Sequence, residues 1–185
     1  SLLMIFLTPP YGGSDESSHL ARIYELSNGK IISDTTDGWP TSLVPDINNG
    51  FSKYSDITLE SKTAVNKEVD MQYTSVYSVI SYIPQTLGML ISRIFLPQNF
   101  WIYLTRIFQS IFCILCIYYS IKIIPYGKNM IFLIGMIPSV LKATTLLSAD
   151  ACLISAIILY LAKILQLSQK NKIEKKDYIV LCIKS

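Results

Sequence analysis

Residues 98–121 read QNFWIYLTRIFQSIFCILCIYYSI, and this stretch decides the fold. Arg106 is its only charged side chain, and about 20 mostly apolar residues are enough for a helix to cross the roughly 30 Å hydrocarbon core of a bilayer. Similar apolar stretches follow at 129–147 and 151–167, each with a single lysine. Because these stretches have hardly any polar face, a buried helical bundle of a soluble protein is the weaker alternative. We therefore predict an all-α integral membrane fold with transmembrane helices at 98–121, 129–147 and 151–167.

Charge is divided unevenly along the 185 residues, of which 51% are hydrophobic and 16% charged. Residues 11–70 hold ten acidic and five basic side chains, a net charge of −5, whereas the remainder holds three acidic and eleven basic ones, a net charge of +8. This composition excludes a disordered chain, and the total of +3 is too small to indicate a nucleic-acid partner. The chain is therefore a polar, acidic segment followed by an apolar, basic one.

Lysines in the short loops predict the orientation, since such loops are enriched in Lys and Arg on the cytoplasmic side. The segment 168–177 carries four lysines and is expected to be a cytoplasmic loop, which places residues 9–97 outside as a long extracytoplasmic loop. Residues 1–8 then form the end of a first transmembrane helix, and residues 178–185 the start of a further one. The chain is expected to be the N-terminal fragment of a larger, multi-pass protein.

An amphipathic helix is predicted at 14–27, just outside the membrane. Pro9 and Pro10 end the preceding helix, Ser14 is the expected N-cap, and Asn28-Gly29 is the expected stop. The interrupted apolar segment 72–95 is expected to lie along the outer interface. Its tyrosines could stack on sugar rings or anchor at the lipid headgroups, and anchoring is the favoured interpretation; they are Tyr73, Tyr77 and Tyr82.

One face of the predicted helix 14–27 gathers ionisable side chains. At about 100° per residue, Asp15, His19 and Arg22 fall within about 60° of one another, and Glu16 points roughly 100° away from Asp15. Such a carboxylate can accept a proton from a substrate hydroxyl while basic neighbours hold a phosphate. The same pattern also describes an N-capped surface helix with charge pairs, and the residues by themselves favour neither interpretation.

Three features of the apolar part bear on function. Arg106 lies about 12 Å down its helix and is expected either to reach outward or to bind an anionic lipid phosphate. Asp150 follows a short turn on the same side of the membrane as Asp15, although capping by Ser148 explains it structurally. Cys113 and Cys116 form a C-x-x-C with no histidine nearby, so we interpret them as apolar helix residues.

The polar positions, taken in order, resemble the DUF2142 family of bacterial polytopic membrane proteins, which belongs with the GT-C glycosyltransferase superfamily. The outer-loop matches are Pro9-Pro10, Asp15-Glu16, His19, Arg22, Tyr24 and Asn28-Gly29-Lys30. The later matches are Tyr82-Ile-Pro84-Gln85-Thr-Leu-Gly88, Thr105-Arg106-Ile-Phe, Ile124-Pro125 and Leu147-Ser148-Ala149-Asp150-Ala151. The resemblance thus extends from residue 9 to about residue 151.

The resemblance implies a GT-C-like helical bundle in the bacterial cytoplasmic membrane with its active site on the outer face. Such enzymes transfer a sugar from a polyprenyl-phosphate carrier to a glycan or another surface polymer. Asp15 is then the favoured catalytic base and Glu16 the second candidate. Residues expected to bind substrate are His19, Arg22 and Arg106 at the carrier phosphate, together with Tyr82 and Asp150. A divalent cation is left open as a cofactor, without assigned metal ligands, and a non-catalytic transporter or assembly factor for surface polysaccharide is the alternative function.

Overall fold

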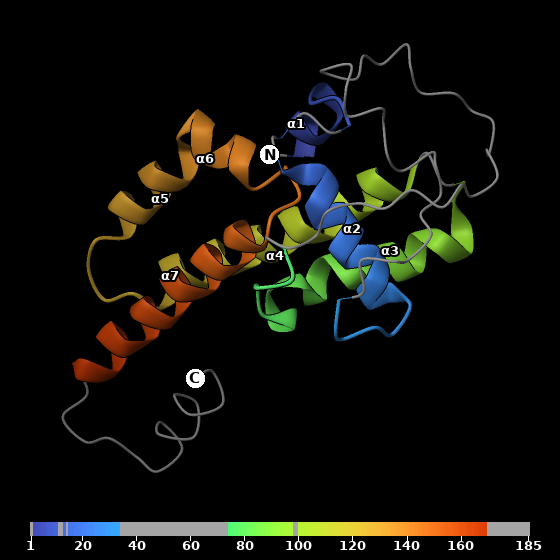
Figure 1. Cartoon of the computed structure of the whole chain (residues 1–185). Coiled ribbons are helices and arrows are strands. Elements are labelled where there is room, and N and C mark those ends of the chain that lie inside the picture. The colour runs from blue at the N-terminus through green and yellow to red at the C-terminus, as the bar shows by residue number, and fades with distance from the viewer. Residues whose placement is uncertain (1, 11–12, 14, 34–73, 98–99, 170–185) are drawn as a thin grey trace.

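The computed structural model describes residues 2–10, 13, 15–33, 74–97 and 100–169, and within these ranges the chain is all-helical with no strand. The α-helices, labelled in Figure 1, are α1 (Leu2–Leu7), α2 (Glu16–Ser27), α3 (Ile83–Phe95), α4 (Trp101–Ile123), α5 (Lys128–Met136), α6 (Pro138–Ala143) and α7 (Ala149–Ser168). The 3-10 turn η4 (Val79–Tyr82) directly precedes α3. The predicted loop 168–177 and the predicted helix 178–185 lie almost wholly outside the described residues, as does most of the segment between α2 and η4.

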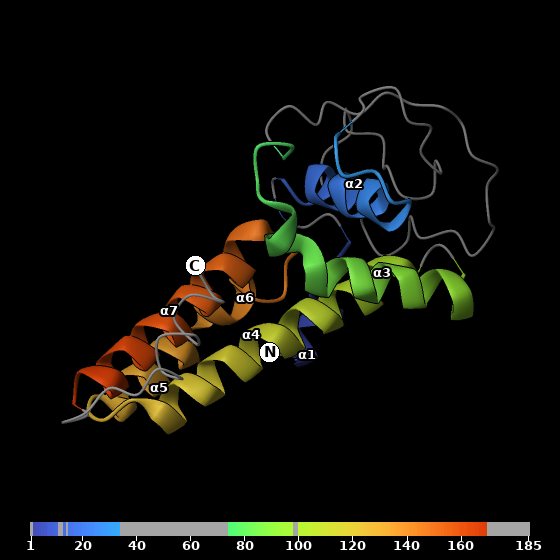
Figure 2. The same cartoon turned by 90° about the horizontal axis from the view of Figure 1, so that it is seen from below.

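Helix α4 is the central element. Helix α3 packs beside its first half and α7 beside its second half, with α5 also in contact (Figure 2). The side of α4 that faces the other helices is mostly polar, whereas its exposed side is apolar, with Ile111, Ile114 and Leu115 among the exposed residues. The buried residues of α4 are Trp101, Ile102, Thr105, Arg106, Gln109, Ser110, Cys113, Cys116 and Ser120. A helix that turns its apolar side outward and its polar side inward suits a lipid environment.

Two helices, α4 and α7, are long and apolar enough to cross a membrane. The single transmembrane helix predicted at 129–147 is not one helix in the structure, which is a correction to the sequence prediction. The chain forms α5, leaves the helical conformation at Ile137 (φ −62°, ψ 128°), and starts α6 at Pro138. The proline ring disfavours the helical conformation of the residue before it, so the break lies at the position where that steric rule places it.

Helices α3 and α4 approach closely at one glycine. A Cβ atom built on Gly88 would lie 3.0 Å from both the Cα of Thr105 and the Cβ of Phe108. Only a residue without a side chain permits this spacing, because the first of these neighbours is backbone. The segment predicted to lie at the interface, 72–95, thus contains a helix that packs tightly on α4, with Pro84 in its first turn.

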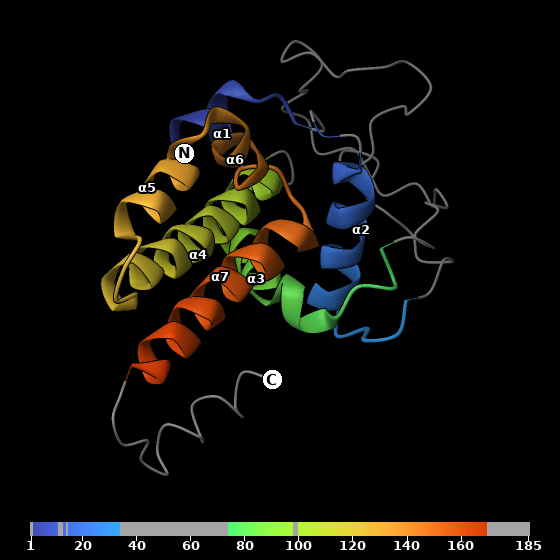
Figure 3. The same cartoon turned by 90° about the vertical axis from the view of Figure 1, so that its left-hand side faces the viewer.

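Helix α2 lies across one end of the bundle rather than along it (Figures 2 and 3). Its last residues are held by Arg93 of α3, whose Nη1 donates to Ser27 Oγ at 2.8 Å and Asn28 Oδ1 at 2.6 Å. The same guanidinium lies over the rings of Tyr24 and Trp101, at 5.2 and 5.9 Å. Helix α2 begins at Glu16, so Asp15 is at the N-cap position that the sequence predicts for Ser14. The helix ends at Ser27 before Gly29, whose φ of +82° suits a glycine.

Candidate functional site

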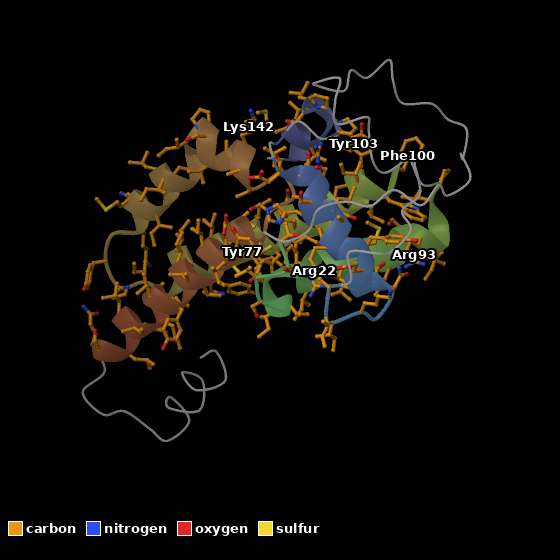
Figure 4. The ribbon with its side chains drawn as sticks, in the orientation of Figure 1. Arg22, Tyr77, Arg93, Phe100, Tyr103 and Lys142 are labelled. Atoms are coloured by element: carbon orange, nitrogen blue, oxygen red, sulfur yellow. The ribbon has the colours of Figure 1, made fainter. Side chains whose placement is uncertain are left out.

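A cluster of aromatic and ionisable side chains forms where α2, η4 and the start of α7 meet. His19 of α2 makes a hydrogen bond through Nδ1 with the hydroxyl of Tyr82, at 2.9 Å. Tyr77, just before η4, donates its hydroxyl to Asp150 Oδ2 at 3.4 Å, and its ring centroid lies 5.7 Å from that of His19. Figure 4 shows Tyr77 between α2 and the start of α7. Four residues that are up to 131 positions apart in the sequence therefore share one site.

The electrostatics of the cluster are set by burial and by two exposed carboxylates. Burial lowers the pKa of His19, and the negative charges of Asp150, Asp15 and, least, Glu16 oppose that change. Burial raises the pKa of Tyr82, whereas the pKa of Tyr77 is raised first by the charge of Asp150. At neutral pH the imidazole is uncharged, both phenols keep their protons, and each can act as a hydrogen-bond donor.

Glu16, the neighbour of Asp15, faces the interior and is paired with Arg106. The pair is bidentate: Arg106 Nε donates to Glu16 Oε1 and Nη2 to Oε2, each at 2.7 Å, and both side chains are 99% or more buried. The remaining guanidinium hydrogens go to backbone carbonyls of Ile5, Thr8 and Pro9 at 2.8–3.2 Å. Arg106 thus neither reaches outward nor faces lipid, since all five of its N–H groups are used inside the protein.

Arg22 is likewise neutralised by a neighbour on its own helix. Its Nη1 donates to Glu25 Oε2 at 2.9 Å, and its Nη2 donates to the carbonyl of Ile31. Both side chains of this pair are at most 2% exposed, and Ser33 Oγ also donates to Glu25. The Arg22–Glu25 pair therefore closes the turn that follows α2, and only the Arg22 Nε, buried without a partner, is left unused.

The sequence-predicted site residues divide into two groups. The cluster brings together Asp15, His19, Tyr82 and Asp150; of these the two aspartates are exposed, and their charges reach His19. The second group is buried in ion pairs: Glu16 pairs with Arg106, and Arg22 pairs with Glu25. The neighbours Asp15 and Glu16 are therefore in opposite environments, one at the surface and one in the interior.

The sequence predicts only an anchoring or stacking role for Tyr77 and no role for Gln85 or Gln109. In the structure Tyr77 donates to Asp150. The buried amide Gln85 Nε2 donates to Gln109 Oε1 and to the Ser148 carbonyl, and Gln109 Oε1 also accepts from the Ser148 N–H, just before α7. Gln109 lies three residues after Arg106. A polar amide inside an apolar helix is costly unless it is hydrogen-bonded, and this cost is the signal that could have identified it.

Among the described residues, no group of three or more His, Cys, Asp and Glu side chains lies close enough to hold a metal ion. What the cluster offers instead is an exposed carboxylate that can accept a proton, together with phenol and imidazole groups that can bind hydroxyls.

Comparison with known proteins gives a family but no characterised relative. A family model described as a predicted membrane protein, DUF2142, matches residues 1–185. No curated protein and no solved structure matches the chain.

Proposed function

The chain belongs to this family of predicted membrane proteins, and on that premise we propose that it is a membrane glycosyltransferase. The reaction is transfer of a sugar from a polyprenyl-phosphate carrier to a cell-surface glycan or polymer, on the outer face of the bacterial cytoplasmic membrane. The observation that carries the proposal is the convergence of Asp15, His19, Tyr82 and Asp150 with Tyr77 at the start of the apolar helix α7.

Asp15 is the proposed catalytic base. The acceptor hydroxyl attacks the anomeric carbon of the donor sugar, its proton passes to the Asp15 carboxylate, and the bond from that carbon to the carrier phosphate oxygen breaks. The polyprenyl phosphate leaves with the electron pair of that bond. Exposure supports Asp15 over Glu16 in this role, because the Glu16 carboxylate is buried and already accepts two hydrogen bonds from Arg106.

The rest of the cluster binds and orients the sugars in this proposal. Asp150 accepts hydrogen bonds from sugar hydroxyls, and the ring of Tyr77 offers an apolar surface for a pyranose face. His19 and Tyr82 hold each other, which leaves the second imidazole nitrogen for a hydroxyl or for the carrier phosphate. Exposed apolar residues along α7, such as Leu153 and Ile157, support an isoprenoid chain lying against this helix.

The family resemblance implies that Arg22 and Arg106 bind the carrier phosphate. In the structure the guanidinium of each lies within 3 Å of a buried carboxylate. We assign them to holding α2 in place, so that Asp15 and His19 face the start of α7.

The decisive experiment is the substitution Asp15→Asn in the intact protein, assayed for glycan transfer in membranes and for membrane insertion. Loss of a general base is expected to lower the rate by roughly 10²–10⁴-fold, whereas Asp15→Glu should keep part of it because it keeps a carboxylate. Lys128→Gln, at the exposed start of α5, is the control and should leave transfer unchanged. Full transfer by the Asn variant would remove Asp15 from the mechanism, and an inserted wild-type protein without any transfer would favour the transport or assembly function.

A further inference from the structure

The connection between α6 and α7, residues 144–148, is held by side chains from three other helices. The Thr144 carbonyl accepts a hydrogen bond from Ser110 Oγ at 2.9 Å, and the Leu147 N–H donates to Glu16 Oε1 at 3.1 Å. Gln85 Nε2 donates to the Ser148 carbonyl at 3.1 Å. A non-helical segment has free backbone groups that are costly to bury, and here α2, α3 and α4 supply their partners.

Gln109 of α4 makes more of these contacts than any other side chain described. Its Nε2 donates to the carbonyls of Thr144, at 3.3 Å, and Leu146. Its Oε1 accepts from the Ser148 N–H at 3.1 Å and from Gln85 Nε2 at 2.9 Å. Both glutamine side chains are fully buried. The two donated and two accepted hydrogen bonds use the full hydrogen-bonding capacity of the Gln109 amide.

This connection leads directly to Asp150. Ser148 Oγ accepts the N–H of Asp150 at 3.1 Å and so fixes the first turn of α7. From that turn the Asp150 carboxylate reaches the Tyr77 hydroxyl at 3.4 Å and lies near His19. The position of Asp150 therefore depends on where Gln109 and its partners hold the preceding backbone.

We propose that Gln109, supported by Gln85 and Glu16, is a positioning residue that holds Asp150 against Tyr77 and His19. It touches no substrate and acts through the backbone of 144–148. A consequence for sugar transfer rests on the proposed function, whereas the coupling between Gln109 and Asp150 does not. Hydrogen bonds suit this task because they are directional and fix the positions of both partners. An apolar contact has no preferred direction, so its partners can slide past each other.

His19 is the reporter for the test, because it is the only histidine in residues 1–185. Histidine is labelled with isotope in the intact protein in lipid nanodiscs, and the His19 NMR signal is assigned as the one that is lost in His19→Asn. Asp150→Asn removes the charge that opposes the lowering of the His19 pKa, so that pKa should fall. Gln109→Met, which keeps a similar side-chain shape without hydrogen bonds, should lower the pKa as well by freeing Asp150.

The double variant makes the test specific. In the Asp150→Asn background, Gln109→Met should produce no further change, since there is no carboxylate left to position. Gln166→Met, near the other end of α7, is the matched control and should leave the His19 titration unchanged. Where Gln109→Met does not fold, Gln85→Met decides by the same criterion.

Two results would overturn the proposal: a folded Gln109→Met protein with the wild-type His19 pKa, or a further fall of that pKa in the Asp150→Asn background. In the transfer assay, Gln109→Met should lower the rate by roughly 10- to 100-fold, as expected for a displaced binding group. Absence of transfer by the wild-type protein would count against the glycosyltransferase proposal alone, because the titration uses no substrate.

Discussion

The two halves of α4 pack in different ways. Its first half is surrounded by α1, α2, α3 and the connection 144–148, and there Arg106 and Gln109 are fully buried with all their hydrogen bonds made inside the protein. Its second half contacts α5 and α7 and leaves large side chains such as Leu115, Tyr118 and Tyr119 exposed. Buried hydrogen bonds thus fix the packing of the first half of α4, beside the candidate site. The second half instead exposes large, mostly apolar side chains.

The largest expected effect is the loss of Arg106 from the first half of α4. Arg106→Met leaves Glu16 as an unpaired buried charge and three carbonyls without their donor, which should cost about 3–5 kcal/mol of unfolding free energy. Lys122→Met, at the exposed end of the same helix, should cost less than about 0.5 kcal/mol. The described cysteines are buried, so a thiol-reactive dye reports unfolding of both variants in detergent. Equal midpoints for the two would show that the buried pair contributes nothing.

A pair of glycine substitutions tests the same contrast through packing. Gly88→Ala places a Cβ 3.0 Å from the backbone of Thr105, so it should destabilise the α3–α4 contact by about 1–3 kcal/mol. Gly135→Ala in α5 meets only Ile117 at 3.6 Å, an ordinary contact, and should be neutral or stabilising by up to about 1 kcal/mol because alanine is the better helix former. Chemical unfolding of both variants gives the two free energies. A tolerated alanine at 88 would mean that the first half of α4 is no more tightly packed than the second.

The smallest expected effect is a pH dependence that arises at the site end. Burial lowers the pKa of His19 below its ordinary value of 6.5, so the unfolded chain takes up a proton first as the pH falls. Stability should therefore decrease from about pH 6.5 downward through the folded-state pKa, and be fully present above 6.5. The difference in unfolding midpoint between wild type and His19→Asn, followed from pH 8 to pH 5, isolates this contribution. A difference that does not vary with pH in that window would contradict the burial of a neutral imidazole.

Much of the helical architecture could be predicted from the sequence. The apolar runs that became α4 and α7 are long and nearly free of charge, and the stop at Asn28-Gly29 follows from local backbone chemistry. The single helix predicted at 129–147 was wrong because the steric effect of Pro138 on Ile137 outweighed the apolar pattern. The steric effect of a proline acts on the residue directly before it. The hydrophobicity of a 19-residue stretch is an average and does not show such a local break.

The candidate site was predictable only in part. Helical periodicity correctly separated Asp15 from Glu16, yet it could not tell which of the two faced the interior. Glu16 is the buried one because the guanidinium of Arg106, 90 residues away, binds its carboxylate in the interior. Gln85 and Gln109 were missed for the same reason, since their partners are backbone groups of a distant connection.

The sequence is enough to predict the membrane class of the chain, its helical composition and the set of polar residues from which a site could be made. These follow from composition, periodicity and turn chemistry, which act over a few residues. Only the tertiary structure decided which carboxylates stay exposed and which are buried in ion pairs with Arg22 and Arg106. The physical reason is that the cost of burying a charge depends on whether a partner is present, and those partners are supplied by packing between helices as well as by neighbours in the chain.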